Sequence, residues 1–286
     1  MMRLSEPDID FNAVLTECIR GITGNNPLRA KVEAGKAVLV AAGAAYVQSG
    51  ASGALHGIPA LDTTIEKDPV VIGTLIKSEL VNLYDYYFRN EKKDARILYD
   101  KLLNSAREEC PFCGGIGTPR NLDHFLPKAH FPQFSTLPQN LVPSCRDCNM
   151  DGKAESFATR EEDQVIQPYL DNERFFSTQW IFGRCIVDAT NRPISIHYQV
   201  VPPNDWEPVH KARVQKHFDD FELARRFSLK AAQRLPTTLA QIAALKNLDM
   251  PNATIRSVIL EPGITNAPFA NHWQLGLYQA LREFLP

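Results

Sequence analysis

The chain lacks several features that would place it in a broad class of proteins. Its longest apolar run, 37–47, is shorter than the ~20 residues of a membrane span, so we expect no membrane segment. The N-terminus has no apolar stretch of the signal-peptide kind, which predicts a cytoplasmic protein with reduced thiols. The 31 basic residues are balanced by 33 acidic ones, giving a net charge of −2. This balance excludes a broadly basic protein that coats nucleic acid, and leaves open a local nucleic-acid site.

The composition is that of a folded globular protein, with 44% apolar and 22% charged residues among 286. No internal repeat or low-complexity tract is present. Changes of texture along the chain divide it into a helical region (1–106), a loop-and-hairpin module rich in proline and glycine (107–160) and a mixed region (161–286). We therefore expect a mainly helical α+β fold.

Apolar periodicity and punctuation by glycine and proline place the regular elements within these regions. Asp68 is expected to cap a helix whose first residue is Pro69, because proline needs no hydrogen-bond partner there. The remaining expected elements are helices over 31–48, 92–107, 206–235 and 273–284, and two strands over 180–187 and 193–201.

Four of the six cysteines form two Cys-x-x-Cys pairs. Two intervening residues allow both sulfurs of a pair to reach one ion, and two such pairs complete a tetrahedral zinc site. The 31 residues between the pairs are more than a zinc ribbon needs, so a folded segment is expected there. The predicted ligands of a structural zinc ion are Cys110, Cys113, Cys145 and Cys148.

The segment between the cysteine pairs carries the residues that suggest catalysis. Asp123 and His124 place a carboxylate next to an imidazole, and Asn149 directly follows the last cysteine of the second pair. A carboxylate oxygen and an amide oxygen suit a hard cation such as Mg²⁺. The imidazole beside them could serve as a base.

This combination resembles the zinc-containing HNH endonucleases, which have a ββα-metal core. The resemblance rests on Cys-x-x-Cys, Asp-His, Asn140, Cys-x-x-Cys-Asn and a trailing Lys153, and covers about 107–155. It identifies the module 107–160 as the nuclease core, flanked by the helical region and an accessory α+β region. The flanking sequence is similar to bacterial members found in mobile-element and anti-phage defence systems.

The resemblance implies a role for each residue. His124 would be the general base, and Asp123 and Asn149 would hold a catalytic Mg²⁺ or Mn²⁺ ion. Asn140 would hydrogen-bond to the imidazole and orient it. Two lysines of the module, Lys128 and Lys153, would contact the phosphate. Many HNH enzymes have histidine where this chain has Asn149, which leaves the preferred cation open.

The function expected from the sequence is metal-dependent hydrolysis of DNA phosphodiester bonds. The residues outside the core could make the chain an effector of a bacterial defence system, with an ATPase partner or as a homo-oligomer. The alternative is a non-catalytic, zinc-stapled binding module that acts through a partner protein. Seven basic against four acidic residues over 206–235 leave two interpretations, a DNA path or a solvated helix face.

Overall fold

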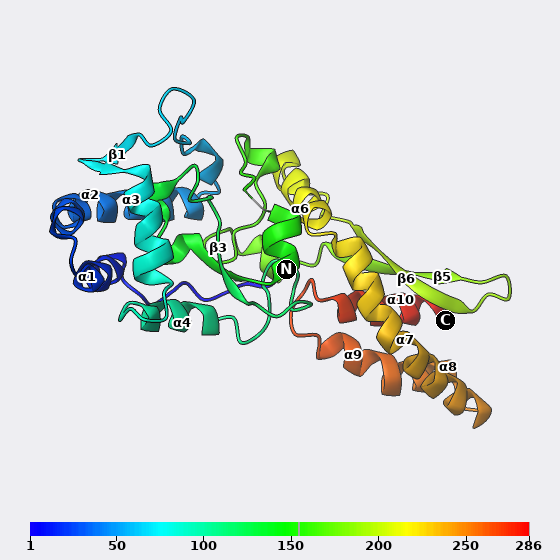
Figure 1. The fold of residues 1–286 in the computed structure, drawn as a ribbon. Coiled ribbons are helices and arrows are strands. Elements are labelled where there is room, and N and C mark those ends of the chain that lie inside the picture. The colour runs from blue at the N-terminus through cyan, green and yellow to red at the C-terminus, as the bar shows by residue number, and fades with distance from the viewer. Residues whose placement is uncertain (154, 286) are drawn as a thin grey trace.

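The computed structural model describes residues 1–153 and 155–285. The helices α1 to α4 lie on one side of the small β3–β4 hairpin, and the C-terminal helices and the long β5–β6 hairpin lie on the other (Figure 1). Helices predominate and the sheets are three separate antiparallel pairs, so the predicted mainly helical α+β class is confirmed. None of the helices in this part of the chain is long and apolar enough to cross a membrane.

The first half of the chain contains more short elements than its sequence predicts. In chain order these are α1 (Phe11–Gly21), α2 (Asn26–Ala51), η1 (Leu55–Gly57), β1 (Val70–Ile72), β2 (Leu75–Ile76), α3 (Lys77–Asn82), the π-helical η2 (Leu83–Phe88), α4 (Arg96–Asn104), β3 (Asn121–His124), η3 (Pro132–Phe134), η4 (Pro138–Asn140) and β4 (Leu141–Ser144).

The second half begins with a π-helical turn next to the second cysteine pair. Its elements are η5 (Asp147–Lys153), η6 (Glu161–Asp163), α5 (Arg174–Ser177), β5 (Ile181–Val187), β6 (Pro193–Val200), α6 (Pro208–Asp220), α7 (Leu223–Asn247), α8 (Asn252–Ile255), η7 (Arg256–Leu260), α9 (Glu261–Thr265) and α10 (Trp273–Phe284).

Capping side chains explain where the first two helices begin. The carboxylate of Asp10 accepts a hydrogen bond from the backbone of Asn12 at 3.2 Å, and Asn25 accepts one from Leu28 at 3.1 Å. Such caps satisfy backbone donors that have no partner inside the helix. The helix predicted over 31–48 is confirmed and belongs to the longer α2.

The helix predicted to begin at Pro69 is wrong, because a short hairpin of β1 and β2 precedes it. Gly73 forms the turn with a φ of 58°, a conformation that glycine adopts without strain. The helix that follows, α3, begins at Lys77 and has Ile76, not Asp68, as its N-cap residue. Asp68 still supports its first turn from outside the helix, by accepting from the backbone and the hydroxyl of Ser78 at 2.7 and 2.6 Å.

The C-terminal elements follow the sequence closely. The two predicted strands pair as β5 and β6, and the predicted last helix is α10. The basic segment 206–235 is divided between α6 and α7 by a left-handed residue, Glu222, with a φ of 49°.

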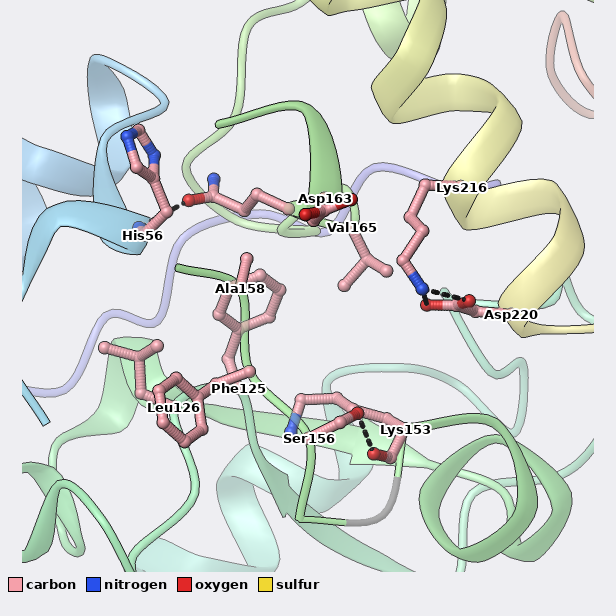
Figure 2. A pocket seen from close by; sticks show the side chains of 12 residues that line it. His56, Phe125, Leu126, Lys153, Ser156, Ala158, Asp163, Val165, Lys216 and Asp220 are labelled. Atoms are coloured by element: carbon pink, nitrogen blue, oxygen red, sulfur yellow. Dashed lines mark hydrogen bonds and ion pairs between the residues drawn. The ribbon is translucent and has the colours of Figure 1, made fainter. Parts of the chain in front are cut away.

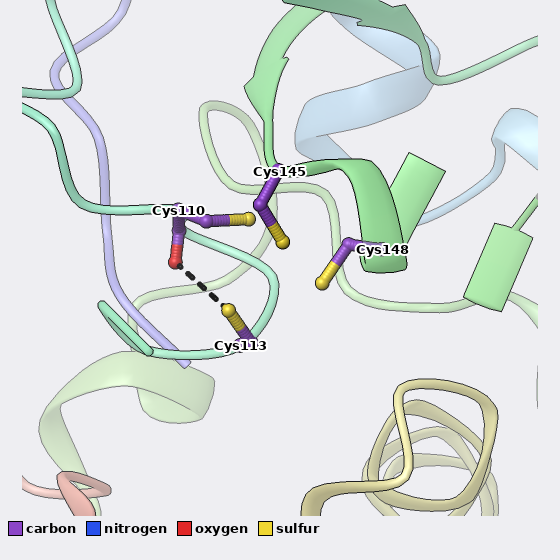
Figure 3. Close-up of side chains that lie close together, drawn as sticks. All are labelled: Cys110, Cys113, Cys145 and Cys148. Atoms are coloured by element: carbon purple, nitrogen blue, oxygen red, sulfur yellow. Dashed lines mark hydrogen bonds between the residues drawn. The ribbon is translucent and has the colours of Figure 1, made fainter. Parts of the chain in front are cut away.

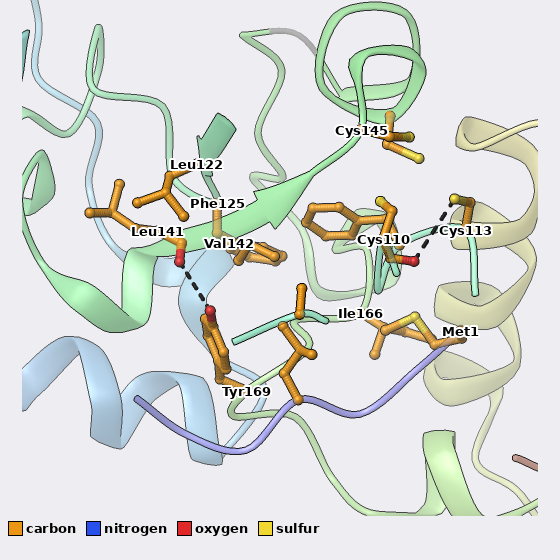
Figure 4. Packing of buried hydrophobic residues seen from close by; sticks show 14 of the residues in the cluster. Met1, Cys110, Cys113, Leu122, Phe125, Leu141, Val142, Cys145, Ile166 and Tyr169 are labelled. Carbon is orange, nitrogen blue, oxygen red and sulfur yellow. Dashed lines mark hydrogen bonds between the residues drawn. The ribbon is translucent and has the colours of Figure 1, made fainter. Parts of the chain in front are cut away.

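A single cluster of buried side chains joins the three regions predicted from the sequence. Figure 4 shows residues of this cluster beside the cysteines, including Leu122 from β3 and Ile166 from the mixed region. Tyr169 donates from its hydroxyl to the carbonyl of Leu141 in β4 at 3.2 Å. The module that carries the site is therefore held by packing from both flanks, while the boundaries at 106/107 and 160/161 remain predictions.

Candidate metal centre and catalytic cleft

The four cysteines of the two pairs come together as the sequence predicts. The sulfur atoms of Cys110, Cys113, Cys145 and Cys148 all lie within 4.8 Å of one another, and all four residues are buried (Figure 3). Gly114, with a φ of 61°, follows the first pair and lets the chain turn tightly there. The cluster can hold a metal ion such as zinc.

The chemistry of this donor set fits a cation. Burial raises the pKa of the Cys110 thiol well above its usual range, because an isolated thiolate is poorly solvated in the interior. A bound divalent ion reverses this preference, since thiolates are the form that ligates zinc. Gly117 adds a backbone donor to the Cys113 sulfur at 3.3 Å, which would stabilise negative charge on it.

An arginine from the second half of the chain contacts the cysteine cluster, and the sequence did not predict it. Arg226 of α7 is 7% exposed, and its guanidinium donates to the sulfur of Cys148 at 3.1 Å and of Cys145 at 3.6 Å. The same group lies 3.5 Å from the carboxylate of Asp147. No spacing in the sequence connects Arg226 with the cysteines, and its place in the basic segment was the only signal.

A buried histidine also fixes the first cysteine turn. His217 of α6 donates from Nε2 to the carbonyl of Phe112 at 2.8 Å and accepts from the backbone of Ile166 at Nδ1 at 3.3 Å. Burial lowers the pKa of His217 to about 3, so the ring is neutral at physiological pH. The sequence assigned no role to this histidine, which lacks ligand spacing.

Asp123 and His124 lie on β3 of the β3–β4 hairpin, and the other strand of this hairpin leads to the second cysteine pair. In the antiparallel register Asp123 lies opposite Val142 and His124 opposite Leu141. β3 ends at His124, and β4 leads directly to Cys145. The cysteine cluster is therefore joined directly to β4, the strand that pairs with the one carrying Asp123 and His124.

Both side chains line a cleft of about 150 Å³. Its walls include the predicted residues Lys128 and Asn149, and also Glu155, which sequence reasoning missed. Asn149 is half-buried in the π-helical turn η5, where its backbone donates to the carbonyl of Cys145 at 3.0 Å. The structure thus brings four of the predicted residues into one cleft.

The imidazole of His124 has a defined tautomer. Its Nε2 lies 2.8 Å from the carbonyl oxygen of Ser135, which can only accept, so Nε2 carries the proton. Nδ1 is then the basic nitrogen, and no described residue hydrogen-bonds to it. Burial lowers the pKa of His124 to about 3, and the ring packs edge-on against Tyr84 at 4.4 Å between centroids.

Asn140 has a different role from the predicted one. Its amide makes no hydrogen bond to the imidazole; it accepts from the backbone of Leu126 and the hydroxyl of Tyr46, and donates to the carbonyls of Leu126 and Phe134. These four bonds close the loop that begins at 125 and ends at Asn140 itself. Asn140 therefore holds the loop that includes Ser135, whose carbonyl contacts His124.

Asp123 is buried with one oxygen that accepts no hydrogen bond. Its Oδ2 has no hydrogen-bond donor among the described residues, and the nearest charge is the ammonium of Lys153 at 3.8 Å. Burial raises the pKa of this carboxyl to about 6. A buried carboxylate oxygen that accepts no hydrogen bond, in a cleft that Asn149 also lines, is a donor set that fits a hard cation.

The two lysines expected to contact phosphate already have protein partners. Lys128 borders the cleft, but its ammonium lies 2.6 Å from both carboxylate oxygens of Asp85. Lys153 is only 5% exposed and donates to the carbonyl of His124 at 2.6 Å. The structure thus shows Lys153 bound to the strand that carries Asp123 and His124.

A second hollow of about 90 Å³ adjoins the residues that follow His124. Figure 2 shows Phe125 and Val165 around it, with the ion pair of Lys216 and Asp220 at 2.5 Å along one side. Lys153 also borders this hollow, while its ammonium reaches the β3 residues of the cleft.

Compared with known proteins, the chain is 37% identical over 227 residues to protein Ea31 of Escherichia phage lambda. The match covers 76% of this chain and 76% of that protein. The chain belongs to the Ea31 family. The name Ea31 states no activity. No family model and no solved structure matches this member of the Ea31 family.

Proposed function

We propose that this protein is a metal-dependent endonuclease of the HNH type that hydrolyses phosphodiester bonds in DNA. The observation that carries the proposal is that His124 and Asp123 line one cleft, and that no described residue hydrogen-bonds to the basic Nδ1 of the imidazole. Asn149 lines the same cleft, so a base and two oxygen ligands of a cation lie together.

The residues of the cleft divide the reaction between them. His124, neutral and held by the Ser135 carbonyl, would accept a proton at Nδ1 from the water that attacks phosphorus. Asp123 and Asn149 would hold a Mg²⁺ or Mn²⁺ ion, which when bound stabilises the charge that develops on the phosphate and the leaving oxygen. The Ser135 carbonyl would then stabilise the imidazolium, since it accepts a hydrogen bond from the protonated Nε2 on the opposite side of the ring.

The cysteine cluster supports the proposal in a structural role. Zinc bound by four cysteines has no open position for a substrate, so a zinc ion there would hold the hairpin and the turn bearing Asn149 in place. The cleft is small and the lysine that lines it, Lys128, is paired with Asp85, so few phosphates would be contacted directly. DNA recognition would then depend on surfaces outside the cleft.

The test is plasmid cleavage over a panel of Mg²⁺, Mn²⁺, Ca²⁺ and Zn²⁺, with bound zinc measured in parallel. His124→Ala should keep its zinc and its fold and lose cleavage by at least a hundredfold. The control is His197→Ala, which removes an exposed histidine of β6. Equal cleavage by wild type and His124→Ala would refute the assignment, and absence of cleavage with every cation would favour the non-catalytic binding module.

A further inference from the structure

We propose that Lys153 couples cation binding to DNA binding in the cleft. In this proposal, which rests on the proposed function, the buried ammonium weakens the affinity of Asp123 for a divalent cation until a DNA phosphate enters. The cation and the DNA would then bind cooperatively, and the free protein would hold little catalytic metal.

The ammonium of Lys153 is fixed close to the cation ligand. It donates to the carbonyl of His124 at 2.6 Å and lies 3.8 Å from Oδ2 of Asp123. Lys153 is 5% exposed, so water screens its charge only weakly. Lys153 ends the π-helical turn that contains Cys148, so both the turn and the strand restrict its position.

The charges of the cleft explain why a cation alone would bind weakly. Asp123 forms an ion pair with Lys153, and Lys128, the lysine that lines the cleft, is neutralised by Asp85. The negative charge of Asp123, the carboxylate expected to bind the cation, is therefore already balanced by Lys153 before a divalent ion arrives. Glu155 also lines the cleft, but it is exposed and its charge is screened by solvent.

A divalent ion bound by Asp123 brings two positive charges close to the positively charged ammonium of Lys153. Repulsion between charges a few ångströms apart is substantial at the effective dielectric of a protein interior. A phosphodiester that binds to the cation in the cleft contributes one negative charge and offsets part of that repulsion. Because linkage is reciprocal, the DNA raises cation affinity by the same factor by which the cation raises DNA affinity.

The test measures Mn²⁺ affinity by electron paramagnetic resonance, with and without a 20-base-pair duplex. All proteins carry His124→Ala so that the duplex stays intact. With Lys153 present, we expect the duplex to tighten Mn²⁺ binding at least tenfold. With Lys153→Met, Mn²⁺ alone should bind at least tenfold more tightly, and the duplex should add less than threefold.

The charge-preserving variant Lys153→Arg separates charge from folding. It should keep most of the coupling, and all variants should retain bound zinc as a check that the cysteine cluster is intact. If Lys153→Met binds Mn²⁺ no more tightly than the parent, or if neither binds Mn²⁺, the coupling proposal is wrong. Wild-type cleavage is a separate readout: its absence would refute the nuclease while the Mn²⁺ titrations still decide the role of Lys153.

Discussion

The guanidinium of Arg226 donates to the sulfur of Cys148 across 3.1 Å, although the two residues are 78 positions apart. Zinc with four thiolates carries a net charge of −2, and a buried cation beside it reduces the cost of that charge. The C-terminal half of the chain thus contacts the four-cysteine cluster formed by the middle of the chain.

Loss of this contact should weaken zinc retention. Arg226→Gln removes the charge from the two sulfurs, and partners of metal ligands typically contribute 10–100-fold to affinity. We expect zinc transfer to a chromophoric chelator to become roughly tenfold faster. Arg225→Gln is the matched control, because Arg225 is exposed and pairs with Glu222. Equal transfer rates for the two variants would show that Arg226 has no such role.

Removal of one cysteine of the cluster should affect both metal content and stability. Cys148→Ser takes away one of four ligands, and the binding energy of a structural zinc is also folding energy. We expect loss of the bound zinc and a decrease in the free energy of unfolding of roughly 5 kcal/mol or more. Cys185→Ser, at a half-buried cysteine outside the cluster, should keep full zinc content by elemental analysis. Full zinc occupancy in Cys148→Ser would contradict the four-ligand site.

We expect Asn140 to contribute mainly to the stability of the loop that it closes, and not through a direct contact with the imidazole. Asn140→Asp keeps the side-chain oxygen that accepts from Leu126 and Tyr46. It replaces the NH₂ group, which donates to the carbonyls of Leu126 and Phe134, by a second oxygen. Two buried acceptors would lose their donor, which costs about 3 kcal/mol in the free energy of unfolding. Urea denaturation measures this loss. Asn172→Asp makes the same change where the side chain only accepts, and should be nearly neutral.

The contribution of His124 and His217 to stability should decrease in acid, because both buried rings stay neutral in the folded protein. His124 and His217 have their pKa lowered to about 3, whereas an unfolded histidine takes up a proton near pH 6.5. Between these values the unfolded chain binds protons that the folded chain excludes. The stabilisation by the two histidines is therefore complete above pH 6.5. As the pH falls from there towards 3, each histidine should lower the free energy of unfolding by about 1.4 kcal/mol per pH unit.

Urea denaturation at pH 7, 6 and 5 measures this slope. His217→Gln can still donate to Phe112 and accept from Ile166, so it should fold and show a slope shallower by one histidine. His197→Gln, at an exposed position, should keep the full slope. An unchanged slope in His217→Gln would mean that this imidazole becomes charged in the folded protein.

The sequence predicted those parts of the site that depend on local spacing. Two residues between cysteines are enough to predict a metal-binding turn, and adjacent Asp123 and His124 predict a ligand beside a base. Arg226 and Ser135 could not be found in this way. Each acts through a contact that depends on how distant segments pack, and the Ser135 contact uses a backbone carbonyl, which every residue has.

The errors have similar physical causes. The apolar spacing after Asp68 suits a helix, but Gly73 permits a tight turn and the first residues pair as a hairpin instead. The burial of Lys153 against β3 was likewise not predicted, because it depends on a turn that sequence spacing does not define, while its contact with phosphate stays a prediction.

The order of synthesis gives the Arg226 contact a further consequence. The four cysteines leave the ribosome before Arg226, which follows Cys148 by 78 residues. At about 5–20 residues per second, that interval lasts roughly 4–16 seconds. During it the nascent thiols have no guanidinium beside them and are exposed to oxidants and to competing metals. Early zinc capture would protect the growing chain, and Arg226 would then secure an ion that is already in place.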